Sequence, residues 1–155
     1  MNDQPKVLLT QEGLTDLKRE FDTLVNKKRP EAVKRVATAR EQGDLSENSE
    51  YAAARDELNF IDGRIGELEE ILNHATLVTN HHSKSAVDIG CRVTLSTNGK
   101  QDIYTIVGEW EANPLEKKIS HSSPLGKSLM GKKVDDRVEV TAPAGKLTYK
   151  ILSIE

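Results

Sequence analysis

Three acidic side chains fall within seven residues after a glycine. They are Asp44, Glu47 and Glu50, and Gly43 precedes them. Asp44 and Glu47 lie three positions apart, so both can project from one side of a helix that begins there. Carboxylates suit Mg²⁺, which usually takes one or two protein carboxylates together with waters and phosphate oxygens. The stretch therefore predicts half of a phosphoryl-transfer metal site, with the remaining ligands supplied by another molecule.

A structural interpretation of the same residues stays open. Asp44, followed three places on by Glu47, resembles a helix capping box, and Ser46 is an alternative N-cap. Acidic side chains in a first turn also complement the helix dipole. The spacing alone does not separate these roles from metal binding.

Two long helical patterns flank the acidic stretch. Apolar residues recur at steps of three and four on the first pattern: Leu14, Leu17, Phe21, Val25, Ala32, Val36 and Ala39. The second pattern is Tyr51, Ala54, Leu58, Ile61, Ile65, Leu68, Leu72 and Ala75. Such periods predict amphipathic helices, and the short connection between them predicts an antiparallel coiled-coil hairpin over residues 1–79.

Three residues mark the ends and the irregular point of the first helix. Thr10 is a candidate N-cap, and Gly43 suits the left-handed residue that follows a helix. Pro30 lacks a backbone donor, so we expect a kink near Lys27 to Pro30, with a break into two helices as the alternative.

Charge is distributed unevenly along the hairpin. The outgoing arm carries a basic strip, which is Lys27, Lys28, Arg29, Lys34, Arg35 and Arg40. The returning arm becomes acidic beyond Arg55. A basic strip that leads to an acidic tip would attract a nucleic-acid backbone. Salt bridges between the arms explain many of these residues equally well.

The second half of the chain has the period of strands. We expect strands over 92–96, 102–108, 134–141 and 147–154, with a hairpin turn at Asn98-Gly99. A short helix should follow Ser122, Ser123 and Pro124. The fold class is thus α+β, with a small antiparallel sheet domain over 86–155 and a linker over 80–85. Adjacent histidines in that linker, His81 and His82, have no nearby ligand partners and predict a solvated segment.

The loop after the second strand offers no recognisable chemistry. Glu109, Glu111 and Glu116 are predicted to form its solvated edge. Trp110, the only tryptophan, either packs in the core or contacts a partner.

Composition excludes several classes of protein. A net charge of -3 argues against a general polyanion binder, and the one cysteine, Cys91, excludes an internal disulfide and predicts a small strand residue. The chain has neither a signal-peptide pattern nor an apolar run of roughly 18 residues. We therefore expect a cytoplasmic protein with no membrane contact.

The acidic stretch belongs to a longer motif that resembles a known family. AREQGDLSENSEYAAARDE at residues 39–57 is similar to the signature of the Gre transcript cleavage factors of bacterial RNA polymerase. TIVGEWEAN, KISHSSPLGKSLMGKKV and AGKLTYKILSI extend the resemblance through the second half. It implies a coiled coil that enters the polymerase's secondary channel and an FKBP-like domain that docks on the channel rim.

The resemblance also implies roles for individual residues. The family's acidic pair falls on Asp44 and Glu47, which would share an Mg²⁺ ion with the polymerase, while the free protein holds no cofactor. Asn48, Glu50 and Tyr51 match the motif and would support the tip. Basic residues of the family that contact the 3′ end of nascent RNA correspond to Arg40 and Arg55.

The factor would not itself be an enzyme. It would activate the polymerase's own hydrolysis of backtracked RNA, and we expect it to be monomeric when free. Trp110, Asn113 and Asp135 depart from the family pattern, which affects the detailed contact surface of the second domain but not the tip. The moderate basic strip favours the GreA-like subgroup over the GreB-like one.

Three other functions remain to be weighed. An antagonist of the same fold would occupy the channel without promoting cleavage. A free-standing peptidyl-prolyl isomerase is suggested only by the implied second fold, and the aromatic-poor sequence offers little for a proline pocket. A coiled-coil adaptor or holdase would need an open apolar seam.

Overall fold

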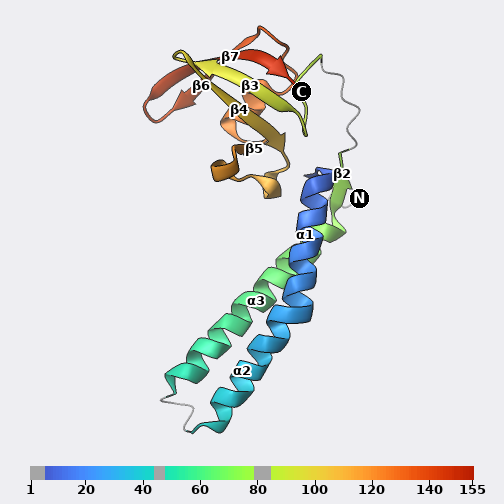
Figure 1. Ribbon diagram of the computed structural model, residues 1–155, viewed down its shortest axis with the longest axis vertical. Helices are drawn as coiled ribbons and strands as arrows, with labels where there is room; N and C mark the ends of the chain where they lie inside the picture. Colours follow the sequence, from blue (N-terminus) through green and yellow to red (C-terminus); the bar gives the residue numbers. More distant parts are fainter. Residues whose placement is uncertain (1–5, 44–47, 79–84) are drawn as a thin grey trace, which may run out of the picture. The chain divides into compact units, whose positions relative to one another are not determined.

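The computed structural model describes residues 6–43, 48–78 and 85–155. The chain divides into two compact units. A hairpin unit extends from Leu14 to His74, and a sheet unit contains the described residues before Leu14 and after His74. Figure 1 shows the long helices of the first unit and the strands of the second. The predicted α+β class is confirmed, whereas the FKBP-like detail stays a prediction.

The outgoing arm is a continuous helical segment with one irregular turn. It consists of α1 (Gln11–Thr23), a π-helical turn η1 (Leu24–Lys28) and α2 (Arg29–Glu41). In η1, the Arg29 N–H donates to the Leu24 carbonyl five residues back. Pro30 follows at once and has no N–H to donate. The irregularity expected near Pro30 is therefore a widened turn, and the alternative of two separate helices is wrong.

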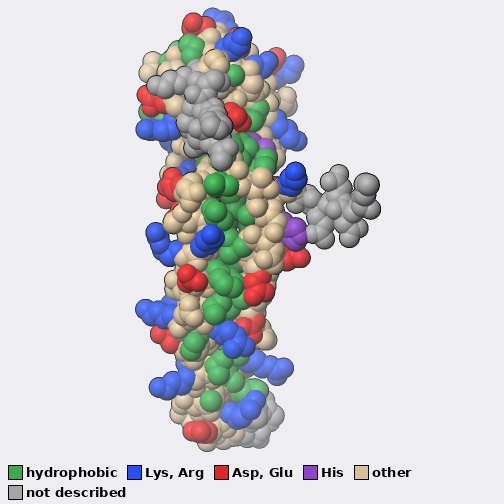
Figure 2. All heavy atoms as spheres, turned by 90° about the vertical axis from the view of Figure 1, so that its right-hand side faces the viewer, with side chains coloured by type: hydrophobic (Ala, Val, Ile, Leu, Met, Phe, Trp, Pro, Cys, Tyr) green, Lys and Arg blue, Asp and Glu red, His purple; other side chains and the backbone are tan. Residues whose placement is uncertain are grey.

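The returning arm is α3 (Ser49–Asn73), which lies antiparallel beside α2 (Figure 1). Its buried residues are Ala54, Ile61, Leu68 and Ile71, and those of the outgoing arm are Leu17, Ala32 and Ala39. Six of these seven belong to the predicted seam, and Ile71 was missed. Ala75 was placed wrongly, because α3 ends at Asn73 and Ala75 begins a strand. Figure 2 shows hydrophobic side chains along the hairpin with charged side chains on both sides.

Salt bridges join the two arms outside the seam. The Arg29 Nε lies 2.7 Å from the Asp62 Oδ1, and Arg35 pairs with Glu57. Farther from the tip, Arg64 of α3 holds Glu20 of α1 with nitrogen–oxygen distances of 2.7 and 3.0 Å. Two residues of the basic strip, Arg29 and Arg35, therefore have the inter-arm partners that the structural interpretation expected.

Both ends of the first 79 residues take part in the sheet unit. Strand β1 (Val7–Leu9) pairs in parallel with β2 (Ala75–Leu77), with Leu8 opposite Thr76. Sequence reasoning assigned both segments to the hairpin, because three-residue strands are too short to show an alternating period. The expected linker at 80–85 falls largely outside the described residues.

The main sheet has five strands in the order β5-β4-β3-β7-β6. Their bounds are β3 Arg92–Thr97, β4 Lys100–Val107, β5 Lys118–Ser120, β6 Arg137–Ala142 and β7 Gly145–Ile154. The turn between β3 and β4 has positive φ at Asn98 (49°) and Gly99 (77°), as the predicted hairpin pair requires. The four predicted strands are present. The short strand β5 was missed, and because it pairs in parallel with β4, the sheet is mixed rather than antiparallel.

A short helix and an aliphatic core complete the sheet unit. Ser123 is the N-cap of helix α4 (Pro124–Leu129), and its hydroxyl accepts the Gly126 N–H at 3.0 Å. The core contains Val87, Ile89, Cys91, Val93, Leu95, Ile106, Leu129, Val138, Ile151 and Ile154. Cys91 is buried, but it lies just ahead of β3, so its prediction as a strand residue is wrong by one position. Trp110 is 47% exposed in the 3₁₀ turn η2 (Glu109–Glu111), so the core-packing interpretation of this residue is wrong.

Glu111 has a structural role that the sequence did not indicate. Thr10 is the predicted cap of α1, and its Oγ1 accepts the Gly13 N–H at 3.1 Å. The Glu111 carboxylate in turn accepts the Thr10 N–H at 2.9 Å and the Gly108 N–H at 3.1 Å. The prediction of a solvated edge was therefore wrong for Glu111. No helix within the described ranges is long and apolar enough to cross a membrane.

Candidate functional site at the end of the hairpin

Helix α2 ends two residues before a glycine with an unusual backbone. The Gln42 N–H donates to the Ala39 carbonyl at 3.2 Å, which tightens the last turn. Gly43 has a φ of +138°, a conformation that L side chains rarely adopt. The predicted role of Gly43 as the residue that ends the helix is confirmed. Asp44, Ser46 and Glu47 lie outside the described residues, and the role of the acidic pair stays a prediction.

Helix α3 begins later than the acidic spacing suggested. Asn48 is its N-cap, with an extended backbone (φ -86°, ψ 97°) and a side-chain Oδ1 that accepts the Tyr51 N–H at 3.1 Å. The prediction that Asp44 or Ser46 caps this helix is therefore wrong. Asparagine is as good an N-cap as aspartate, and Glu50 is the acidic residue of the first turn. The expectation that Asp44 and Glu47 both lie in the first turn of α3 is wrong for the same reason, because that turn begins at Ser49.

The Asn48 side chain also reaches the other helix. Its Nδ2 donates to the Ala39 carbonyl at 2.8 Å, across the seam. That carbonyl lies in the last turn of α2, and it also accepts the Gln42 N–H. One amide thus satisfies a free donor at the start of α3 and gives a carbonyl at the end of α2 a second hydrogen bond.

Tyr51 brings together the two arginines that the sequence assigned to RNA contact. The Arg40 guanidinium lies over the Tyr51 ring, 5.9 Å from its centroid. The pKa of the Tyr51 hydroxyl is lowered, mainly by a hydrogen bond from Arg40, with further contributions from the charges of Arg40 and Arg55 and a hydrogen bond from Arg55. Arg40 and Arg55 are both exposed. The structure therefore places two accessible positive charges beside one hydroxyl, a combination that suits an anionic group.

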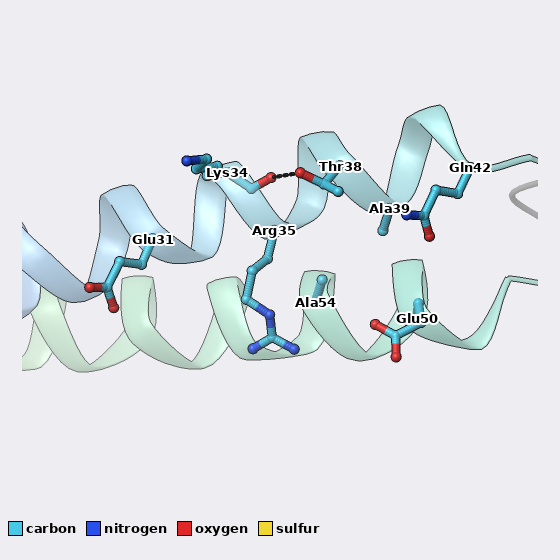
Figure 3. A pocket seen from close by; sticks show the side chains of 8 residues that line it. All are labelled: Glu31, Lys34, Arg35, Thr38, Ala39, Gln42, Glu50 and Ala54. Carbon is cyan, nitrogen blue, oxygen red and sulfur yellow. Dashed lines mark hydrogen bonds between the residues drawn. The ribbon is translucent and has the colours of Figure 1, made fainter.

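Glu50 belongs to a different surface. It lines a groove of about 480 Å³ between α2 and α3, whose floor includes the buried residues Ala39 and Ala54 (Figure 3). The other lining residues are Glu31, Lys34, Arg35, Thr38 and Gln42. Acidic and basic side chains both line the groove, and Arg35 already pairs with Glu57. The groove therefore favours neither anionic nor cationic ligands. Of the five predicted site residues that are described, three lie around a fourth, Tyr51, and Glu50 does not. The three are Arg40, Asn48 and Arg55.

Sequence reasoning missed the double role of Asn48. The available signal was an asparagine three residues before Tyr51, the first residue of the uninterrupted apolar seam. Two acidic residues at capping-box spacing made the earlier start more attractive. The contact to Ala39 has no sequence signal, because it depends on the register between the two helices.

Comparisons with known proteins cover nearly the whole chain. Residues 7–77 match the family described as transcription elongation factor, N-terminal, and residues 82–155 match transcription elongation factor, GreA/GreB, C-term. Transcription elongation factor GreA of Lactococcus lactis subsp. lactis is 47% identical over 150 residues, covering 95% of this chain and 96% of the relative. The GreA of Bacillus anthracis is 43% identical and covers 95% of both chains.

Solved structures give further matches. GreA factor homolog 1 (Gfh1) of Thermus thermophilus is 30% identical with a TM-score of 0.46, covering 97% of this chain and 99% of that chain. Another structure of the transcription factor Gfh1 is 29% identical with a TM-score of 0.48, covering 97% of both chains.

Proposed function

The chain belongs to the GreA/GreB family of transcription elongation factors, and we propose that it rescues arrested RNA polymerase by stimulating the polymerase's own cleavage of backtracked RNA. The observation that carries this proposal is the family match over both halves of the chain, at 43% identity or more to curated relatives. The intact motif at residues 39–57 supports it. The factor acts on RNA polymerase and is not itself the nuclease.

The two units have separate tasks in this proposal. The hairpin enters the secondary channel of the polymerase, and the sheet unit docks on the channel rim. The antiparallel pairing of α2 and α3 supports the first task, because it brings Gly43 and Asn48 to the same end of two long helices (Figure 1). Inter-arm ion pairs at Arg29, Arg35 and Arg64 further hold the two arms together.

The acidic pair supplies the chemical contribution. Asp44 and Glu47 would hold an Mg²⁺ ion that is shared with the polymerase, and such an ion lowers the pKa of bound water and so favours hydroxide as a nucleophile. Within the described ranges, no group of three His, Cys, Asp or Glu residues could hold a metal. Two carboxylates suit an ion whose other ligands come from phosphates and a partner.

Basic residues near the tip would bind the RNA. Arg40 and Arg55 are exposed and converge on Tyr51, which supports their proposed contact with a phosphate of the RNA 3′ segment. Lys27, Lys28 and Lys34 are exposed along the outgoing arm. These positive charges would attract RNA in a salt-dependent manner.

A transcript cleavage assay tests the proposed function directly. Polymerase complexes stalled in a backtracked state are incubated with Mg²⁺, with and without the factor, and the RNA is sized on a gel. We expect shortened transcripts to accumulate at least about tenfold faster with the factor, since an added catalytic group commonly contributes 10²-fold or more. Binding to polymerase without any acceleration would instead identify the channel-occupying antagonist.

A further inference from the structure

We propose that the amide nitrogen of Asn48 is a positioning group, which ties the end of α2 to the start of α3 and thereby fixes the two residues, Gly43 and Asn48, that flank the acidic pair. This inference rests on the proposed function, because the position of the pair matters only if its carboxylates act in the polymerase. It assigns different tasks to the two ends of a single side chain. The oxygen stabilises a helix, whereas the nitrogen couples two helices.

The hydrogen bonds define these two tasks. The Oδ1 accepts the Tyr51 N–H at 3.1 Å within the same helix, three residues on. The Nδ2 donates to the Ala39 carbonyl at 2.8 Å, nine residues away in sequence and on the other arm. Because the side chain is part-buried, water competes less well for these groups than at an exposed site.

The location of this tie explains why the hairpin needs it. Ala39 and Ala54 are the buried seam residues closest to the tip, at 5% and 1% exposure. Alanine side chains bury little apolar surface, so packing alone holds the helices weakly here. A directional hydrogen bond supplies the register that small side chains do not.

Tyr51 provides a second contact on the same turn of α3. Its ring lies under the Arg40 guanidinium, one residue beyond Ala39. Both contacts therefore join Ala39 and Arg40 of α2 to Asn48 and Tyr51 of α3. The carboxylates must be held closely, because a misplacement of about 1 Å can cost 100-fold in rate.

Substitutions at position 48 separate the two tasks. Asn48→Asp and Asn48→Ser keep an oxygen that can cap α3, since Asp, Ser and Asn are comparable N-caps. Neither retains the amide that donates to Ala39. Asn48→Ser adds no charge near the acidic turn, which controls for the charge of Asn48→Asp. Asn48→Ala removes both tasks, and Asn73→Asp at the exposed far end of α3 is the matched control.

The coupling is measured first in the free full-length protein. Spin labels are placed at Glu41→Cys and Ala52→Cys, which are exposed positions on either side of the tip. The native cysteine, Cys91, is buried at 1% exposure. We expect a broadened inter-label distance distribution in Asn48→Asp and Asn48→Ser, with the helix content of the parent. Distributions as narrow as that of the parent would overturn the proposal.

The same variants are then assayed with stalled polymerase. We expect Asn48→Ser to lower the cleavage rate at saturating factor by about tenfold, within the range that small misplacements cause, while polymerase binding stays within twofold. A merely structural role predicts parental cleavage in both capped variants and a loss only in Asn48→Ala, which would contradict the proposal. If the parent itself gave no cleavage, the proposed function would fail, and the spin-label distances would still decide whether the amide couples the helices.

Discussion

At the scale of single residues, the end of the hairpin depends on polar side chains that serve both helices. Asn48 donates to α2 and accepts from α3, and Tyr51 lies beneath an arginine of the opposite arm. These contacts occur where the buried seam residues, Ala39 and Ala54, are small. The side chains expected to contact RNA are therefore positioned by the residues that close the hairpin.

The lowered pKa of Tyr51 gives a spectroscopic prediction. The neighbouring arginines lower the pKa of Tyr51, whereas burial, helped by the Asp102 charge, raises the pKa of Tyr104. In an absorbance titration of phenolate, Tyr51→Phe should remove an ionisation that precedes the ionisation of Tyr104. Arg40→Gln should shift the ionisation of Tyr51 toward higher pH. A titration unchanged in both variants would contradict the contact.

The same shift has a defined effect on stability. A tyrosine with a lower pKa in the folded state than in the unfolded state binds fewer protons when folded. The contribution of Tyr51 to the free energy of unfolding should therefore increase as pH rises from the folded pKa toward the unfolded value near 10. The difference between the urea midpoints of the parent and of Tyr51→Phe should increase across this pH window. A decrease in that difference would contradict the lowered pKa of Tyr51.

Charge at Arg55 should matter for RNA more than for docking. Arg55 is exposed one turn beyond Tyr51, and Arg55→Glu replaces attraction of phosphate by repulsion. We expect crosslinking of the factor to backtracked RNA to fall several-fold, while affinity for polymerase changes little. Arg19→Glu, exposed on α1 far along the chain from the tip, is the control. Equal crosslinking of RNA to the Arg55 variant and the parent would remove Arg55 from the proposed contact.

At the scale of elements, periodicity predicted the helices and the longer strands because these bury alternating faces. Ile61 and Leu68 of α3, and Val93 and Leu95 of β3, are buried as their spacing indicates. The strands β1, β2 and β5 have three residues each and show no period. The start of α3 was misplaced because Asp44 and Glu47 imitate a capping box, and the contacts of Asn48 and Glu111 depend on tertiary register.

Two helical glycines should respond in opposite ways to the same substitution. Gly63 in α3 has open space around an added Cβ, whereas a Cβ at Gly126 in α4 would lie 2.0 Å from the Ser120 carbonyl oxygen. Gly63→Ala should therefore raise the free energy of unfolding by about 0.5–1 kcal/mol, by helix propensity. Gly126→Ala should lower it by about 1–3 kcal/mol, because the core is overpacked.

Separate probes assign these changes to their units. Helical circular dichroism reports mainly on the hairpin, and Trp110 fluorescence reports on the sheet unit, which holds the only tryptophan. Gly63→Ala should move the urea transition followed by circular dichroism, and Gly126→Ala should move the transition followed by Trp110 fluorescence. A stabilising Gly126→Ala change would refute the close approach of α4 to Ser120.

At the scale of the whole molecule, helix α3 exposes most of its charged residues and buries a narrow apolar seam. The adaptor or holdase alternative requires an open apolar seam, yet Ala54, Ile61 and Leu68 are at most 6% exposed. The family match favours an elongation factor that acts with RNA polymerase, and the contribution of tip carboxylates to the polymerase stays our proposal.

The most direct measurement compares Asp44→Ala and Glu47→Ala with the parent in the cleavage assay, with polymerase affinity determined in parallel. Glu41→Ala, an exposed acidic residue of the adjacent helix end, is the control. We predict that each tip variant loses cleavage stimulation by about 100-fold or more, as removal of a transition-state group does, while its affinity stays within twofold of the parent. Full cleavage by either tip variant, or a large loss of affinity in both, would contradict the donation of this acidic pair to the polymerase.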